Sequence, residues 1–303
     1  MKDLYSIAGI SKQALHQSRT RKDYQLRVTE RVIHECTSIR KSHPRMSCRK
    51  MFVRLKKPIG IGRDIFEQIG FANGFKVHVI RNKKRTTWAT KLSVFDNHLE
   101  GATLNGFNQA WQSDIFYYEE YYGISIIDVY SRRLLALHAS KHLTADQNVK
   151  ALRKAVKERL GHNIEGCIFH SDRGTQYISD AQKALLKELK MIPSMCKLPQ
   201  ENAYAERVQG TVKHEYLYSD NPPETKIQKR FNQIMWLYNN ERPHANLGNK
   251  TPTEFEANVN KMSPKVRPQL TVYKWSHPLL TKVNVIDKKE KSSKKEKRQH
   301  QIN

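Results

Sequence analysis

The sequence has few cysteines and no Cys-x-x-Cys pair. The four, at positions 36, 48, 167 and 196, match neither a disulfide framework nor a zinc ribbon in their spacing. No stretch approaches the roughly 18 apolar residues of a membrane-spanning helix. The first residues, MKDLYSIAGISK, lack the apolar run of a signal peptide. We therefore expect a cytoplasmic protein that is not held together by disulfides and does not enter a membrane.

Acidic residues are scarce toward both ends of the chain. The 303 residues carry a net charge of +25. Basic residues outnumber acidic ones by 22 to 8 in residues 1–100 and by 12 to 3 in residues 261–303, but only by 20 to 18 between these segments. Basic arms around a nearly neutral middle suit a polyanion, because each neutralised phosphate releases counterions. Solubility alone would not require charge to be sorted by segment. We therefore expect a nucleic-acid partner.

Residues 1–80 are predicted to be an all-α, helix-turn-helix DNA-binding region. In LYSIAGISKQALHQ, Gly9 ends one short helix and Ser11 is placed to cap the next. A longer helical segment follows, with Leu26, Ile33, Cys36 and Ile39 on one side, and ends at His43 and Pro44. SCRKMFVRL and GRDIFEQIGFANGF predict a second helix pair. Many helix pairs bind nothing, so the DNA-binding interpretation depends on the local charge.

Residues 81–107 are interpreted as a basic linker. Its run Arg81, Asn82, Lys83, Lys84 and Arg85 has no apolar period and could lie on a phosphate backbone. At the other end of the chain, residues 261–303 are basic, with few apolar side chains in the last part, and are predicted to form a partly disordered tail.

Residues 108–220 predict an α/β core. QAWQSDIFYYE, GISIIDVYSRR and LLALHASKH alternate or are rich in aromatic and β-branched residues, which indicates three antiparallel strands joined by short turns. A helix from Thr144, a strand GCIFHSD, a helix SDAQKALLKELK, a strand IPSMCK and a helix over 202–216 follow. This order predicts a mixed five-stranded sheet with helices on both faces. Residues 221–260 are predicted to add C-terminal helices to this core.

Three acidic residues lie where their neighbours are expected to be buried. Asp114 is inside the first strand, and a lone carboxylate there costs several kcal/mol unless it meets a cation. Asp172 ends the fourth strand, which this layout places beside the first. Glu206 shares a helix face with Gln209 and Lys213, apart from the apolar stripe. Taken singly, each acid has an ordinary interpretation, as an ion pair, a turn former and a solvated residue. Together they predict a site for Mg²⁺ or Mn²⁺.

The motifs WQSDI, HSDRGTQY, ENAYAERVQGTVKHEYL and YNNERPHANLGNKTPTEF resemble the consecutive signatures of the insertion-sequence-3 family of bacterial transposases, specifically the OrfB product. The resemblance runs from about residue 5 to residue 260. It implies a ribonuclease-H-like, retroviral-integrase-like core with a DDE triad of Asp114, Asp172 and Glu206 that acts as catalytic and metal-binding set, with two Mg²⁺ or Mn²⁺ ions.

The resemblance further implies a DNA transposase that cleaves and joins element ends. Its partners would be double-stranded DNA, both terminal inverted repeats and target, an OrfA protein or fusion, and further copies of the chain on DNA in the bacterial nucleoid. Two alternatives stay open. The first is a nuclease with the same core that cuts without joining, and the second is a DNA-binding regulator whose core is inactive.

Several residues around the triad need separate interpretation. Glu201 rivals Glu206 as the third carboxylate, but it stands at the expected helix start, where an acid is often a favourable end charge. Asp128 is interpreted as structural, paired with Arg132 or Arg133. Lys213 is a candidate for a phosphate contact near the scissile bond, and the basic run of residues 81–85 is a candidate for a contact with the DNA backbone. His170 is expected to be a neutral, packed side chain, and the segment ERPHANLG, which contains Arg242 and His244, is expected to join helices and contact DNA.

Overall fold

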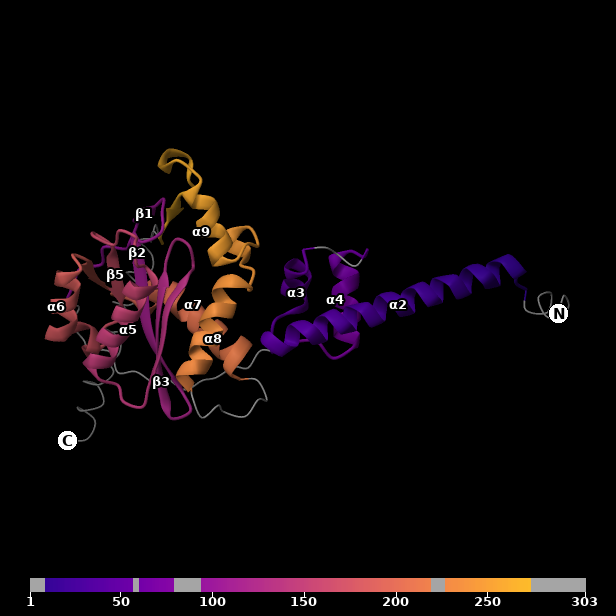
Figure 1. Ribbon diagram of the computed structural model, residues 1–303, viewed down its shortest axis with the longest axis horizontal. Helices are drawn as coiled ribbons and strands as arrows, with labels where there is room; N and C mark the ends of the chain where they lie inside the picture. Colours follow the sequence, from indigo (N-terminus) through magenta and orange to yellow (C-terminus); the bar gives the residue numbers. More distant parts are fainter. Residues whose placement is uncertain (1–8, 57–59, 79–93, 219–226, 274–303) are drawn as a thin grey trace, which may run out of the picture.

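The computed structural model describes residues 9–56, 60–78, 94–218 and 227–273. Figure 1 shows two parts, a helical arm formed by residues 9–78 and a sheet-based core formed by residues 94–273. The long helix α2 projects away from the core, and the helices α3 and α4 pack beside the end of α2 that lies nearer to the core. In these residues no helix is both long and apolar enough to cross a membrane.

The helical arm contains α2 (Lys12–Ser42), α3 (Cys48–Arg54) and α4 (Arg63–Ala72). The Ser11 side chain caps α2 as predicted, because its Oγ accepts a hydrogen bond from the Ala14 N–H at 3.0 Å. The two helical segments expected between residues 11 and 42 are one continuous helix, since no glycine or proline interrupts them. The first helix of the predicted helix-turn-helix falls largely within residues 1–8, which lie outside the described residues.

The buried side of α2 differs from the predicted one. Its buried side chains are Val28, Val32, Cys36 and Ile39, whereas Leu26 is 60% exposed. The apolar cluster of the arm joins these residues to side chains of α3 and α4, which lie against the second half of α2. The first half therefore has no described element against which Leu26 could be buried.

The core is built on the predicted five-stranded mixed sheet. Its strands are β2 (Ala110–Tyr118), β3 (Tyr121–Asp128), β4 (Leu134–Ser140), β5 (Ile168–Ser171) and β6 (Ile192–Met195). Their spatial order is β4-β3-β2-β5-β6. β2, β3 and β4 form the antiparallel meander, and β5 and β6 run parallel to β2. The ribonuclease-H-like arrangement is therefore confirmed.

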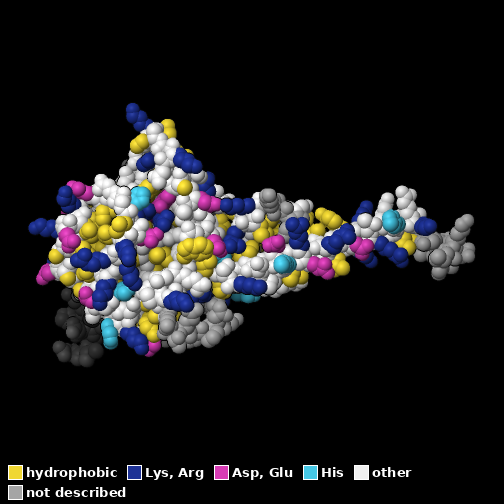
Figure 2. Space-filling view, in the orientation of Figure 1, with side chains coloured by type: hydrophobic (Ala, Val, Ile, Leu, Met, Phe, Trp, Pro, Cys, Tyr) yellow, Lys and Arg dark blue, Asp and Glu magenta, His cyan; other side chains and the backbone are white. Residues whose placement is uncertain are grey.

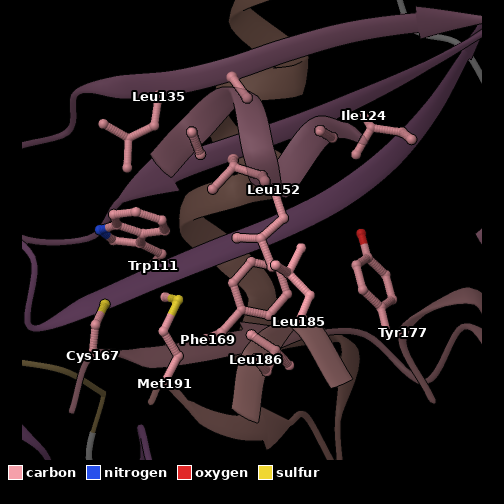
Figure 3. Close-up of a cluster of buried hydrophobic side chains, with 14 residues drawn as sticks. Trp111, Ile124, Leu135, Leu152, Cys167, Phe169, Tyr177, Leu185, Leu186 and Met191 are labelled. Atoms are coloured by element: carbon pink, nitrogen blue, oxygen red, sulfur yellow. The ribbon is translucent and has the colours of Figure 1, made fainter. Parts of the chain in front are cut away.

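Helices cover both faces of this sheet. On one face, α5 (Ala145–Glu158) and α6 (Asp180–Glu188) enclose an apolar cluster in which Trp111, Leu152 and Phe169 meet, as Figure 3 shows. On the other face lie α7 (Ala203–Thr211), a π-helical turn that continues it (Val212–Leu217) and α8 (Ile227–Asn240). α9 (Pro252–Asn260) follows, capped by the reciprocal bonds of Thr251 and Glu254. Short 3₁₀ turns are η1 (Thr175–Ile178), η2 (Pro199–Asn202), η4 (Ala245–Leu247) and η5 (Pro264–Val266).

Two short strands extend the core beyond its predicted limits at residues 108 and 260. β1 (Thr103–Leu104) pairs antiparallel with β7 (Leu270–Thr271). The apolar side chains of Leu104 and Val272 are buried in one cluster with Val129 and Tyr130 of the core. Parts of the expected linker and of the expected tail therefore belong to the packed structure.

The arm docks on the core through polar groups. Lys50 of α3 forms an ion pair with Glu215, and Arg54 with Glu241. The buried His43 ring hydrogen-bonds with the Tyr216 hydroxyl and with Glu241, both at 3.0 Å. Because Glu215 and Tyr216 continue the helix that carries Glu206, the arm contacts the far end of that helix.

Candidate active site

Two of the three predicted carboxylates lie at the same level of two neighbouring parallel strands. Ser113 of β2 lies opposite Ser171 of β5 in the parallel register. Asp114 and Asp172 follow these residues directly, so they stand side by side on strands that are roughly 5 Å apart. β5 ends at Ser171 while β2 continues to Tyr118. Asp114 therefore lies at the fork where the two strands separate.

The third carboxylate comes from the first turn of α7. Ala205 and Val208 bury one side of α7 in the apolar cluster on the sheet. Glu206 is exposed on another side. Its charge acts on Asp114, and that of Asp172 acts on it. The fold therefore places Asp114, Asp172 and Glu206 near enough for their charges to act on one another, and their role as a catalytic set stays a prediction.

The pKa values of all three carboxyl groups are raised, so it is costly for the three to be ionised together. Burial raises the pKa of Asp114 well above its ordinary value, and the charges of Asp172 and Glu206 raise it further. Burial also raises the pKa of Asp172, although its Oδ1 accepts a hydrogen bond from the Gly174 N–H at 3.0 Å. Although Glu206 is exposed, partial desolvation and the charge of Asp172 raise its pKa. Perturbed pKa values of clustered carboxylates are typical of functional sites.

This donor set fits a hard divalent cation. Oxygen ligands from carboxylates are those that Mg²⁺ and Mn²⁺ prefer, and a cation would remove the repulsion that raises the three pKa values. Among the described residues, no three His, Cys, Asp or Glu side chains already close around a space of metal size.

Lys213 faces the same site. Its ammonium lies 5.2 Å from the centroid of the Phe116 ring. Phe116 comes two residues after Asp114 on β2, so both side chains lie on the same face of the sheet. Burial lowers the pKa of Lys213, and the charge of Asp114 opposes this shift. The structure thus places Lys213 near Asp114, and its contact with a phosphate stays a prediction. The other predicted contacts, from Arg81 to Arg85, lie outside the described residues.

Glu201, the rival third carboxylate, is occupied elsewhere. It is 2% exposed. Its Oε2 accepts hydrogen bonds from the N–H groups of Lys197 at 2.6 Å and Leu198 at 3.1 Å, and from the Asn97 side chain at 3.0 Å. Three donors satisfy this oxygen and hold the loop before α7. Glu201 therefore holds the loop, while the charge of Glu206 acts on Asp114, which favours Glu206 as the third carboxylate.

Two buried amides that the sequence analysis overlooked join β2 to α7. The Oε1 of Gln112 accepts hydrogen bonds from the N–H groups of Tyr204 and Ala205 at 3.1 and 3.2 Å, and its Nε2 donates to the Glu201 carbonyl at 2.9 Å. The Asn202 side chain donates to the Ser113 carbonyl at 3.0 Å. The first N–H groups of a helix lack partners within it, so Gln112 caps α7 from another element. A glutamine within a buried strand was the available signal.

Other acidic and basic residues nearby have structural roles. Asp128 is completely buried and accepts hydrogen bonds from the N–H groups of Asn108 and Ser131, which agrees with the structural interpretation. Its cation is Arg159, at 3.6 Å, and not the expected Arg132 or Arg133. The turn after β3 points those two side chains elsewhere: Arg133 pairs with Glu158 and Glu256, and Arg132 stacks on Tyr204.

The neutral, packed interpretation of His170 is confirmed. Its ring is completely buried and hydrogen-bonds with the Ser194 hydroxyl at 2.9 Å. Burial lowers the pKa of His170 to about 4, so the ring carries no charge near neutral pH. Arg242 also has the expected joining role, because its guanidinium grips Glu215 through two bonds of 2.7 and 2.8 Å.

Comparison with known families identifies the core. Residues 105–198 match a family model of the integrase core domain, and residues 188–252 match a second model with the same description. The three carboxylates fall within these two segments. This part of the chain is therefore similar to the integrase core domain.

Similar proteins come from insertion elements. The transposase for insertion sequence element IS904 of Lactococcus lactis is 31% identical over 160 residues, which cover 49% of this chain and 61% of the relative. The transposase InsF for insertion sequence IS3A of Escherichia coli is 31% identical over 175 residues, covering 54% and 60%. The resemblance to insertion-sequence-3 transposases is thus confirmed, while the chain matches only about three fifths of the length of these relatives.

The fold of the chain is also similar to that of a chain in a solved assembly. It is the simian T-cell lymphotropic virus intasome in complex with a PP2A regulatory subunit, with 15% identity, a TM-score of 0.46, and coverage of 75% of each chain.

Proposed function

We propose that this integrase-core protein, a relative of insertion-sequence transposases, cuts the ends of a mobile DNA element and joins them to a target. The observation that carries the proposal is the meeting of Asp114, Asp172 and Glu206 on the rigid sheet and on a helix fixed to it. Such rigid placement is what a two-step phosphoryl transfer requires.

The three carboxylates and Lys213 would have different roles around the reacting phosphate. Asp114 and Asp172 stand on neighbouring strands and Glu206 on α7, so the reacting phosphate would lie over the fork between β2 and β5. Lys213 would contact one of its oxygens, because its ammonium already faces this site. Water would attack in the cleavage step and the freed 3′-hydroxyl in the joining step. Neither step requires a covalent bond to the protein.

The proposed cofactor is a pair of Mg²⁺ or Mn²⁺ ions held by the three carboxylates. When bound, the metal supplies activation of the attacking oxygen and neutralisation of the charge that develops on the leaving oxygen. The carboxylate set suits this role because its own charges repel one another in a poorly solvated place.

DNA is the proposed substrate, and its binding would use the positive charge of the chain. Figure 2 shows Lys and Arg side chains over the visible face of both the core and the helical arm. We include Arg81, Lys83, Lys84 and Arg85 among the contacts, together with the N-terminal helices. An OrfA protein or fusion and further copies of the chain would complete the complex on the element ends.

The decisive experiment is a gel assay of the purified chain, with and without OrfA, on labelled duplex that carries the terminal repeats flanking its gene. The buffer contains Mn²⁺, and Glu206→Gln is compared with Glu201→Gln. Both variants remove one carboxylate charge, but only Glu206 meets the aspartates. We expect nicked and joined products from the wild type and from Glu201→Gln at permissive temperature, and none from Glu206→Gln.

Other outcomes would redirect the assignment. Nicks without joined products would favour a nuclease with the same core. Tight DNA binding without any product, with every metal and partner, would favour a regulator. Asp172→Asn is expected to abolish cleavage and preserve DNA affinity, so equal loss of both would show that Asp172 is structural.

A further inference from the structure

A pocket of about 160 Å³ lies on another side of α7 from Glu206. Successive residues of an α-helix are turned by roughly 100°, so Arg207, Thr211 and Tyr204 point about 100° to 160° away from Glu206. These three residues line the pocket. The turn after β3, the loop after α8 and α3 of the arm supply the other walls, with Arg132, Lys50, Arg242, His244 and Asn246 among them.

The lining of this pocket is basic. Lys50, Arg132, Arg207 and Arg242 line it, and no acidic residue does. Glu215, from behind the wall, pairs with Lys50 and Arg242. Among the described residues, Arg132 and Arg207 form no ion pair. At least two positive charges are therefore left over at one pocket.

The positive charges that line the pocket affect the pKa of His244. Burial lowers the pKa of His244 to about 2, with further lowering by the charges of Arg242 and Lys50. Burial also lowers the pKa of Lys50, and Arg242 adds to the shift. Nearby positive charges disfavour a further one and favour an anion. The pocket therefore has the electrostatic character of an anion site.

Arg132, which lines the pocket, has an unused hydrogen-bond donor. Its backbone adopts the left-handed conformation, with φ of 60°, and its guanidinium stacks on the Tyr204 ring at 3.9 Å. Within the described residues, its buried Nη1 has no hydrogen-bond partner. A buried donor on a permanently charged group is costly when unpaired. An anion with several acceptor oxygens would pair with it.

We propose that this pocket binds a phosphate of the DNA backbone, at a place distinct from the reacting phosphate. Arginine forks and a nearby side-chain amide, here that of Asn246, are typical phosphate contacts in DNA complexes. Because α7 separates the pocket from the triad, one helix would register the duplex on one side and present Glu206 on the other. The identification of DNA rests on the proposed function, whereas the anion chemistry does not.

The test compares DNA affinity of the full chain by fluorescence anisotropy, with a labelled duplex, in Ca²⁺ to prevent cleavage, over a series of salt concentrations. Arg132→Gly removes the guanidinium at a position whose positive φ suits glycine. Arg207→Gln tests an exposed side chain. Arg153→Gln is the matched control, because Arg153 lies on α5 across the sheet and its ion pair within the described residues is a long one, with Glu188 at 3.8 Å.

Each pocket variant is expected to weaken binding about tenfold and to reduce the slope of log affinity against log salt by about 1, which is one lost phosphate contact. Thermal melting of Arg132→Gly should stay close to that of the wild type. Unchanged affinity and slope in both variants would overturn the proposal. An equal effect of Arg153→Gln would do so too, because it would indicate general charge loss.

A melting experiment with inorganic phosphate shows whether the pocket binds free phosphate or a phosphate of DNA. If the pocket serves free phosphate instead of DNA, millimolar phosphate will raise the melting temperature of the wild type but not of Arg132→Gly, while DNA affinity stays equal. That result overturns the DNA assignment. Failure of the proposed function looks different: the wild type would bind DNA through the pocket yet show no Glu206-dependent cleavage.

Discussion

Gln112→Met is the sharpest test of how the active site is held. Methionine fills a similar volume but can neither cap α7 nor donate to the Glu201 carbonyl. Gln112 is completely buried, so no water can take over its three hydrogen bonds at 2.9, 3.1 and 3.2 Å. Both the start of α7 and the loop before it would lose their link to β2.

The size of the effect follows from these bonds. A net contribution of about 1 kcal/mol for each bond gives about 3 kcal/mol, and the two helix N–H groups left without partners bring the loss to about 3–5 kcal/mol. Glu206 stands one residue beyond Ala205, whose N–H is released. A displacement of about 1 Å at a catalytic group costs on the order of 100-fold in rate.

The assay measures urea unfolding and the rate of strand cleavage at saturating DNA. Leu152→Ala is the matched control, because Leu152 is completely buried on the opposite face of the sheet and its truncation costs about 2–5 kcal/mol. We expect cleavage to fall about 100-fold in Gln112→Met and only slightly in Leu152→Ala. Equal loss of activity in the two variants would refute the positioning role, since stability alone would then explain it.

Three further predictions concern stability. Burial opposes ionisation of Glu215, but Arg242 and Lys50 outweigh it and lower its pKa from 4.5 to about 2; on the order of 3 kcal/mol of stability, present above pH 4.5, should be lost as the pH falls toward 2. Urea unfolding at pH 5 and pH 3 measures the part of this loss that falls between these pH values, about 2 kcal/mol, as the difference between the wild type and Glu215→Gln. Gly123→Ala should cost about 1–3 kcal/mol in thermal melts, because the added Cβ would come within 2.3 Å of the Phe116 ring; an unchanged melting temperature would contradict this packing. Arg159→Met should cost about 3–5 kcal/mol, since Asp128 would lose its cation inside the core, and a calorimetric scan that shows no loss would disprove that pairing.

The local sequence pattern was sufficient to predict most helices and strands of the core. The alternation of QAWQSDIFYYE predicted β2, and the apolar run before Asp172 predicted β5. Strand and helix formation depends on periods of two and 3.6 residues, which neighbouring residues reveal. The same patterns placed Asp114, Asp172 and Glu206 on the elements that the structure brings together.

Patterns misjudged features that depend on distant partners. Leu26 matched an apolar helix face, but α3 and α4 cover only the second half of α2. β1 and β7 are 165 or more positions apart and pair across the boundary of the predicted tail. Asp128 found its cation on α5 and not in its own turn.

The sequence by itself determined the sheet, its helices and the three carboxylates, because motif order and local periodicity are written along the chain. The tertiary structure decided how these parts are held. It turned Glu201 into the anchor of a loop and Gln112 into the cap of a helix, and it gathered four cations at one pocket. Such roles depend on which surfaces pack together across long sequence separations, and no local period encodes that choice.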